Sequence, residues 1–381
     1  MIPYSDFYFF YIMFLLLIPA IILGLMGKQI KYYGLFVSLV VLFLIFGNSK
    51  QQYEYLILFY LLELLLVKSY ILIRKVFGSR WILWLMIISS LAPLLYTKFG
   101  RMLNFKALGF LGISYLSFKA VQMIIEIYDG LITNINFVDF TYFMIFFPTI
   151  SSGPIDRSRR FMEDTSKKLT RREYVEYLGE GLWKIVQGIA YKFLIAYYID
   201  NYWLRKIPLK HHTFKLGLKY MYAYSFYLFF DFAGYSLIAI GVSYILGIKT
   251  PENFNMPFIS KDIKDFWKRW HMTLSFWFRD FIYTRFVMAS LKNKWFKNKY
   301  IASYIGYMIT MGLMGLWHGT ENFYIIYGLY HGFLIVITDY FQRQKFYKKV
   351  KNNLFWKITS TIVTFNLVCF GFLIFSGYLF K

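Results

Sequence analysis

The sequence predicts an all-α polytopic membrane protein, and three observations carry this prediction. Of the 381 residues, 58% are hydrophobic and 23% are aromatic, with a mean hydropathy of +0.46, which is too apolar for an ordinary soluble domain. Apolar runs near the roughly 17 to 25 residues that a spanning helix needs recur along the chain. Basic residues gather between these runs, as the positive-inside rule expects. We therefore expect one integral membrane domain over residues 1–381.

The apolar runs give eleven candidate spans, and an expected helix over Asp265 to Met288 adds to them. Because at least one segment is expected not to cross, we predict about eleven transmembrane helices. The candidate spans are Phe7 to Met26, Tyr32 to Phe46, Tyr53 to Ile73, Trp81 to Tyr96, Ala107 to Tyr128, Phe137 to Ile150, Leu182 to Leu204, Leu216 to Ile248, Tyr300 to Leu316, Phe323 to Phe341 and Leu354 to Phe380.

The distribution of charge identifies the segment that does not cross. Lys28 and Lys31 follow the first run and no Lys or Arg precedes it, so we expect a retained anchor with its N-terminus outside. Strict alternation would then place the basic loop Ser151 to Lys168 outside, against the rule. We therefore expect Phe137 to Ile150 to be a half-helix or a steeply tilted piece. The charged stretch Gly153 to Glu180 after it is expected to form an interfacial helix and turn.

The chain is strongly basic and has a single cysteine. Lys and Arg number 43 against 20 acidic residues, a formal net charge of +23. This excess fits the positive-inside bias with anionic lipid headgroups, and it also fits an acidic cytosolic partner. No nucleic-acid partner is expected, because the basic clusters lie in short loops without a recognition motif. Cys369 alone excludes an intrachain disulfide and a cysteine-based metal site.

Polar and Pro/Gly-rich residues interrupt the apolar pattern from Asp231 to Arg285 and again at Trp317-His318-Gly319. Such residues survive at membrane depth only when they are buried in protein or face a wet cavity. We interpret this region as the floor of a functional site that contains His271. Apolar residues at three-to-four spacing over Lys261 to Arg285 predict one slanted or partly interfacial helix, in which Asp265 meets basic residues one turn on.

Three of the five histidines lie in or beside apolar runs. A continuous helix from Tyr300 to Tyr340 would be roughly 60 Å long, so the chain must turn near Gly319 and His318 must end a helix. His318 then serves either as a hydrogen-bonded hairpin residue or as a general base. His331 is interpreted as structural or supporting, and His271 lies near enough in sequence to meet His318. The pair His211-His212 is expected to be solvated.

Other ionisable residues offer weaker candidates. Asp231 can pair with a basic residue or orient an imidazole, and Glu63 has the same two interpretations. No carboxylate cluster accompanies the histidines, so no metal site is predicted. The sequence contains no GxSxG elbow, Walker A loop or GxGxxG, and hydrolase, ATPase and dinucleotide-binding functions receive no support.

Several motifs in a fixed order resemble the membrane-bound O-acyltransferase (MBOAT) superfamily. They are FDFAGYSLIAIG, PENFNMPFIS, FWKRWHMTLSFWFRDFIYTRF and MGLWHG. The upstream segments LGISYLSFKAVQMIIEIYDG and FPTISSGPIDRSRRF, with the MIPY start, resemble its DltB branch, the teichoic acid D-alanyltransferases. The similarity extends from Met1 to about His331, and Leu354 to Phe380 carries no matching motif.

The resemblance implies a fold and a reaction. The fold would be a ring of helices around a thin central neck, with His318 as the catalytic histidine and His271 as the second site position. D-alanine would arrive as a thioester on the phosphopantetheine arm of an acidic carrier protein in the cytosol. It would leave to a hydroxyl acceptor on the outer face for lipoteichoic acid D-alanylation, with other proteins of that system assisting. No permanently bound cofactor is expected, and the expected location is the cell membrane of a Gram-positive bacterium.

The roles of single residues follow as hypotheses. His318 would deprotonate the acceptor hydroxyl, and His271 would position the donor or stabilise developing charge. A positive, partly apolar surface at the end of the motif helix would bind the carrier, formed by Arg285, Val287, Met288, Lys292 and Lys294. Two alternatives remain, a polysaccharide O-acetyltransferase of the same superfamily and a membrane transporter with intramembrane charges along its path.

Overall fold

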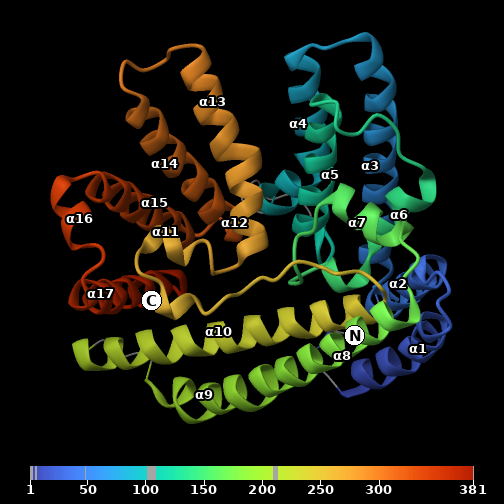
Figure 1. The fold of residues 1–381 in the computed structure, drawn as a ribbon, viewed down its shortest axis with the longest axis horizontal. Helices are drawn as coiled ribbons and strands as arrows, with labels where there is room; N and C mark the ends of the chain where they lie inside the picture. The colour runs from blue at the N-terminus through green and yellow to red at the C-terminus, as the bar shows by residue number, and fades with distance from the viewer. Residues whose placement is uncertain (1–2, 5–6, 48, 101–108, 209–212, 381) are drawn as a thin grey trace. The chain divides into compact units, whose positions relative to one another are not determined.

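The computed structural model describes residues 3–4, 7–47, 49–100, 109–208 and 213–380. Throughout these residues the regular elements are helical (Figure 1). The chain forms two compact units. Unit 1 comprises Met1–Ile189 and Tyr235–Pro251, and unit 2 comprises Ala190–Gly234 and Glu252–Lys381. The prediction of a single domain over 1–381 stays a prediction.

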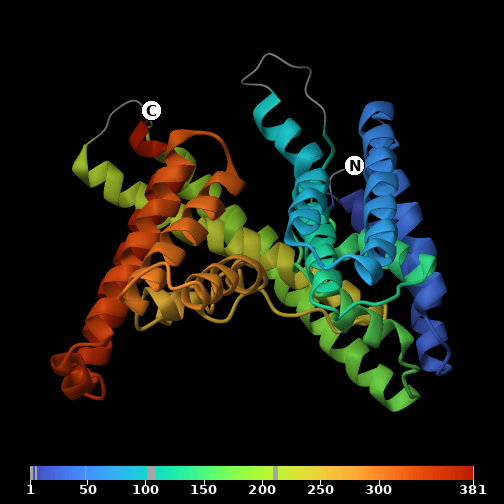
Figure 2. The same ribbon diagram turned by 90° about the horizontal axis from the view of Figure 1, so that it is seen from above.

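Unit 1 contains the first eight α-helices and the second part of α10. Helices α3, α4 and α5 pack against one another (Figure 1 and Figure 2). The helices are α1 (Phe7–Leu25), α2 (Lys31–Phe46), α3 (Lys50–Val76), α4 (Arg80–Phe99), α5 (Ile113–Tyr128), α6 (Phe137–Ile145), the 3-10 turn η2 (Phe147–Thr149), α7 (Ser158–Ser166), α8 (Arg171–Ile189) and α10 (Phe214–Ile245).

Unit 2 contains the first part of α10 and the helices that follow it. Helix α15 packs between α14 and α17, which are coloured orange to red in Figure 1. The elements are the π-helix η3 (Ala190–Ala196), α9 (Tyr197–Tyr202), η4 (Leu204–Lys206), η5 (Pro257–Ile259), α11 (Ile263–Phe266), α12 (Met272–Phe278), the π-helix η6 (Arg279–Tyr283), α13 (Thr284–Lys292), α14 (Lys299–His318), α15 (Asn322–Gln342), α16 (Lys345–Val350), α17 (Leu354–Phe375) and η7 (Tyr378–Phe380).

Six of the described helices are long and apolar enough to cross a membrane, namely α1, α3, α4, α10, α15 and α17. A seventh apolar helix, α2, has 16 residues. The predicted count of about eleven spans is not confirmed by these helices. Part of the predicted span Ala107 to Tyr128 lies outside the described residues, and α5 begins at Ile113.

The predicted half-helix is present as α6, which ends at Ile145 and is too short to span a bilayer. A buried lysine of α5 stabilises the backbone where α6 breaks. The Lys119 ammonium donates to the carbonyl of Phe143 at 2.9 Å, to the carbonyl of Met144 at 3.3 Å and to the Thr149 hydroxyl at 2.9 Å. An ammonium has three donors, so this lysine is fully used in supplying the hydrogen bonds that the broken helix lacks.

The segment Gly153 to Phe161 also packs against α5 through polar contacts. Gln122 of α5 donates to the carbonyl of Asp156 at 2.8 Å, and Ser158 donates to the Glu126 carboxylate at 2.8 Å. The Asp156 carboxylate accepts from Arg160, one turn along α7. The stretch Gly153 to Glu180 contains the short α7 and the start of α8, and buried hydrogen bonds hold α7 against α5. Its interfacial position stays a prediction.

Small residues bring α14 and α15 close together in unit 2. A Cβ atom at Gly328 would lie 2.3 Å from the carbonyl oxygen of Met311, and one at Gly315 would lie 2.4 Å from that of Tyr324. Neither contact leaves room for a side chain, so the two helices approach backbone to backbone. The hairpin that sequence length predicted around Gly319 is thus a tightly packed helix pair.

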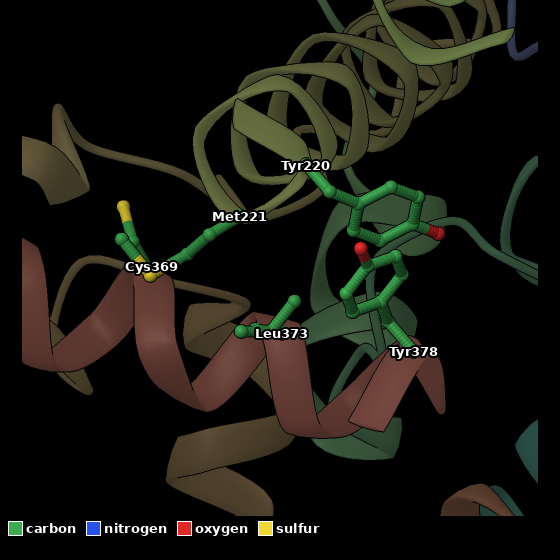
Figure 3. Close-up of a cluster of buried hydrophobic side chains, with 5 residues drawn as sticks. All are labelled: Tyr220, Met221, Cys369, Leu373 and Tyr378. Carbon is green, nitrogen blue, oxygen red and sulfur yellow. The ribbon is translucent and has the colours of Figure 1, made fainter. Parts of the chain in front are cut away.

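Helix α17 packs against the first part of α10 through a buried cluster (Figure 3). The ring of Tyr378 stacks on that of Tyr220, with 4.4 Å between the centroids. Met221, Cys369 and Leu373 complete the cluster. These contacts fix α17 against α10 within unit 2, and α17 supplies two residues of the pocket described next.

Candidate active site

The predicted helix over Lys261 to Arg285 is wrong, because the chain breaks at His271. Helix α11 ends at Phe266 and α12 begins at Met272. His271 lies between them with φ of 42° and ψ of 54°, a left-handed conformation that only a few per cent of non-glycine residues adopt. The expected ion pair within this segment does form, between Arg269 Nε and Asp265 Oδ1 at 3.0 Å.

The loop that precedes α11 causes this break. The backbone N–H of Met272 donates to the carbonyl of Asn253 at 2.9 Å, and the N–H of Asn255 donates to the carbonyl of Arg269 at 2.9 Å. These backbone groups therefore bond to the loop instead of continuing the helix. Buried backbone groups need hydrogen-bond partners, and here the PENFN segment provides them in place of the helix. His271 therefore lies in a turn between two helices. Strained conformations of this kind cluster at functional sites.

His318 is the last residue of α14, as predicted, and α15 begins four residues later at Asn322. A Cβ atom at Gly319 would lie 2.4 Å from ring atoms of Tyr324. Glycine is therefore required for the first turn of α15 to approach the helix end. The His318 ring meets Phe375 of α17 edge to face, with 4.9 Å between the centroids.

The two histidines line one pocket within unit 2, which we call the aromatic pocket. Its empty space measures about 440 Å³, including space open to the surroundings. The rings of His271 and His318 both lie near that of Trp317, at centroid distances of 6.4 Å and 4.7 Å. The lining residues are Leu228, Phe232, Trp267, Trp270, His271, Leu274, His318, Tyr327, Phe372 and Phe375.

The aromatic pocket surrounds its two imidazoles with apolar rings. His271 is 3% exposed, and the ring of Phe232 stands edge to face against it with 4.7 Å between centroids. His271 lies outside the six candidate spans. Its burial, and to a smaller extent the nearby His318, lowers the pKa of its imidazole below the ordinary value. His271 is therefore neutral near pH 7, and its Nε2 has no hydrogen-bond partner among the described residues.

Comparison with known proteins decides the family. The model of MBOAT, the membrane-bound O-acyltransferase family, matches residues 22–380. The chain belongs to the membrane-bound O-acyltransferase family. It is 48% identical to the teichoic acid D-alanyltransferase of Bacillus subtilis, over 99% of this chain and 98% of the relative. It is 39% identical to the enzyme of the same name from Streptococcus thermophilus, over 99% and 95% of the two chains. A probable alginate O-acetylase of Pseudomonas aeruginosa is 33% identical, over 70% of this chain and 48% of the relative.

The other ionisable candidates that the structure describes do not line the aromatic pocket. Asp231 forms an ion pair with Lys192 of the π-helix η3, which agrees with the interpretation that it pairs with a basic residue. Glu63 is buried in α3 and accepts from the Ser90 hydroxyl at 2.9 Å. His331 is fully buried in α15, where aromatic rings surround it. His211 and His212 lie outside the described residues.

The predicted carrier-binding residues lie on and just after α13 of the acyltransferase. Met288, Lys292 and Lys294 are exposed, whereas Arg285 and Val287 are partly buried. Val287 faces α14, since a Cβ atom at Gly306 would lie 3.1 Å from it. Leu291 and Trp295, which sequence reasoning did not include, add exposed apolar area beside the two lysines. We call Met288, Leu291, Lys292, Lys294 and Trp295 the α13 surface.

Sequence reasoning missed most of the wall of the acyltransferase pocket. Phe372 and Phe375 come from α17, in which no motif was found, and only the fold brings them to His318. Trp267, Trp270 and Phe232 lie inside the quoted motifs, but the spacing of the two tryptophans served only to predict a slanted or partly interfacial helix, and Phe232 was not considered. Across the described residues no three histidine, cysteine, aspartate or glutamate side chains gather as metal ligands would.

Proposed function

We propose that this acyltransferase moves D-alanine from a carrier-protein thioester to a hydroxyl acceptor, for D-alanylation of lipoteichoic acid. The observation that carries the proposal is that His271 and His318, from two different elements, line the same aromatic pocket. The full-length relatives are named teichoic acid D-alanyltransferases, and this name indicates D-alanine as the acyl group and teichoic acid as the class of acceptor. The location would be the cell membrane of a Gram-positive bacterium, with several helices crossing it.

The chemistry uses His318 as the base. Its imidazole takes the proton of the acceptor hydroxyl while the hydroxyl oxygen attacks the thioester carbonyl carbon. A carbon–oxygen bond forms, and the carbonyl oxygen takes up the negative charge. When this intermediate collapses the carbon–sulfur bond breaks, and the thiolate receives the proton that His318 holds. A thioester is already activated, so the reaction needs no nucleotide and no permanently bound cofactor.

His271 acts on the acyl group in this proposal. Its side chain is neutral, buried and held by a strained backbone, so its position is fixed before the substrate arrives. Fixed polar groups in a site that excludes water stabilise developing charge more than mobile ones do. His271 therefore positions the donor or stabilises the charge on its carbonyl oxygen.

The carrier protein would dock on the α13 surface. Carrier proteins of the expected kind are acidic, and this surface combines two exposed lysines with exposed Met288, Leu291 and Trp295. Complementary charge speeds the encounter, and exposed aromatic and methionine side chains supply contact area. Other proteins of the D-alanylation system would assist after transfer.

The decisive experiment follows radiolabelled D-alanine from its charged carrier in membranes that contain the wild-type chain, His318→Ala or His318→Gln. We expect the wild type to discharge the carrier and both variants to be inactive although they insert normally. A parallel assay with an acetyl donor tests the alternative that the partial similarity to the alginate O-acetylase raises. Transfer of acetyl without D-alanine would replace the proposed substrate, and a fully active His318→Ala protein would remove the proposed base.

A further inference from the structure

Two side chains that line the aromatic pocket each carry a buried nitrogen atom without a hydrogen-bond partner among the described residues. One is Nε2 of His271 and the other is Nε1 of Trp267. Both residues line the pocket, and their exposed fractions are 3% and 8%. An indole N–H can only donate, and a buried donor without an acceptor is costly and rare in native structures. The Trp267 indole therefore needs an acceptor that the described residues do not supply.

The surrounding rings hold the Trp267 side chain in place. Its ring stands edge to face against His331, with 5.2 Å between centroids and an interplanar angle of 86°. Phe266 meets it at 5.5 Å in a similar geometry. The backbone N–H of Trp267 bonds to the carbonyl of Ile263 at 3.2 Å, which fixes its Cα at the end of α11. The indole is thus a preorganised donor, which costs no rearrangement when an acceptor arrives.

We infer that the indole N–H of Trp267 donates a hydrogen bond to the carbonyl oxygen of the transferred acyl group. The inference rests on the proposed function. It assigns a further catalytic residue and explains the unpaired indole donor. The hydrogen bond strengthens when the hydroxyl oxygen adds to the carbonyl carbon and the carbonyl oxygen becomes negative. Trp267 transfers no proton, since the proton of the acceptor passes through His318 to the leaving thiolate.

The first test is kinetic and uses Trp267→Phe, which keeps an aromatic ring and removes the donor. Loss of one such donor lowers the turnover number by about 100-fold, and we expect carrier binding to stay within about twofold of the wild type, since no contact with the carrier is lost. Trp277→Phe is the matched control, because Trp277 is 4% exposed on α12 but does not line the pocket. The control should retain most of the activity. Equal turnover in Trp267→Phe and Trp277→Phe would overturn the inference.

The second test needs no turnover, so it stands apart from the proposed reaction. The His318→Ala protein is mixed with carrier that bears D-alanine with a ¹³C-labelled thioester carbonyl, and the carbonyl stretch is recorded by infrared difference spectroscopy. A hydrogen bond to the carbonyl oxygen lowers its frequency. We expect the frequency to be lower with His318→Ala than in the free charged carrier, and we expect this shift to be lost in the double variant that also carries Trp267→Phe. The same frequency in both proteins, or no shift in either, would refute donation by Trp267. Failure of the wild type to transfer D-alanine, with the shift present, would refute only the proposed reaction.

Discussion

The Thr273 hydroxyl donates to the Asn253 side-chain oxygen at 2.6 Å, across 20 residues of sequence. This buried hydrogen bond lies two residues after His271. The backbone bond from Met272 to Asn253 lies between them. Together the two bonds hold the left-handed turn that points His271 out of the helix. The position of the His271 imidazole in unit 2 therefore depends on a loop whose own residues do not line the aromatic pocket.

Thr273→Val should lower the transfer rate about 10- to 100-fold, because a displacement of about 1 Å in a catalytic group has an effect of this size. Asn253→Ala removes the same bond and also the acceptor of the Thr273 backbone N–H at 3.4 Å, so the double variant should be no worse than Asn253→Ala alone. Turnover of purified protein with charged carrier measures this. Thr310→Val is the control, because the buried Thr310 hydroxyl donates to the Gly306 carbonyl one turn back in α14 at 2.7 Å. Additive losses in the double variant would contradict the explanation.

The left-handed backbone at His271 predicts an unusual order of stability. Glycine adopts positive φ without strain, whereas alanine in this conformation costs about 1–2 kcal/mol. His271→Gly should therefore unfold at a higher denaturant concentration than His271→Ala, although neither variant should transfer D-alanine.

The same pair of substitutions at Ser275 serves as the comparison. Ser275 lies within α12, where glycine is about 1 kcal/mol less stable than alanine. The order of stability should therefore reverse between the two positions. Unfolding in detergent, followed by circular dichroism, provides the measurement. If alanine is more stable than glycine at both positions, the turn at 271 is not strained.

Charge reversal on the α13 surface should weaken carrier binding and flatten its dependence on salt. Lys292→Glu with Lys294→Glu replaces attraction by repulsion for an acidic partner, and this difference should shrink at high ionic strength. Binding of carrier to the purified acyltransferase can be titrated at about 50 mM and about 500 mM salt, either side of physiological screening.

The matched control changes the net charge equally at another exposed site. Lys348→Glu with Lys349→Glu alters two exposed lysines of α16. If carriers dock on α13, this variant should bind like the wild type. Equal weakening by both pairs would indicate a general effect of net charge and would remove the α13 surface from the proposal.

Close packing of α8 and α10 within unit 1 predicts a strong effect of one methyl group. A Cβ atom at Gly241 would lie 2.4 Å from the carbonyl oxygen of Gly181 and 2.7 Å from Ile185. Gly241→Ala should therefore force the helices apart and lower the melting temperature. Gly179→Ala on α8 meets nothing within 4 Å and should stabilise the helix by about 1 kcal/mol. A neutral Gly241→Ala variant would mean that the packing is looser than described.

The sequence predicted local features well where physical length decided them. The break at His318 was predictable because a continuous helix from Tyr300 to Tyr340 would be too long for a bilayer. The short α6 was predictable because strict alternation of spans conflicted with the charge pattern. The break at His271 was not predictable from spacing, since the hydrogen bonds that interrupt the helix come from Asn253 and Asn255. Phe372 and Phe375 were missed for the same reason, because they reach His318 only through packing of α17.

The turn at His271 also has a consequence for the order of folding. Residues on both sides of it have helical spacing, so a nascent chain is expected to propagate helix through this position until the PENFN loop docks and competes for the backbone groups of Arg269 and Met272. We therefore expect the imidazole to reach its final orientation late, after the surrounding tertiary contacts form. A newly inserted chain would then remain chemically inert, and the appearance of acyl transfer would report completed maturation of the protein.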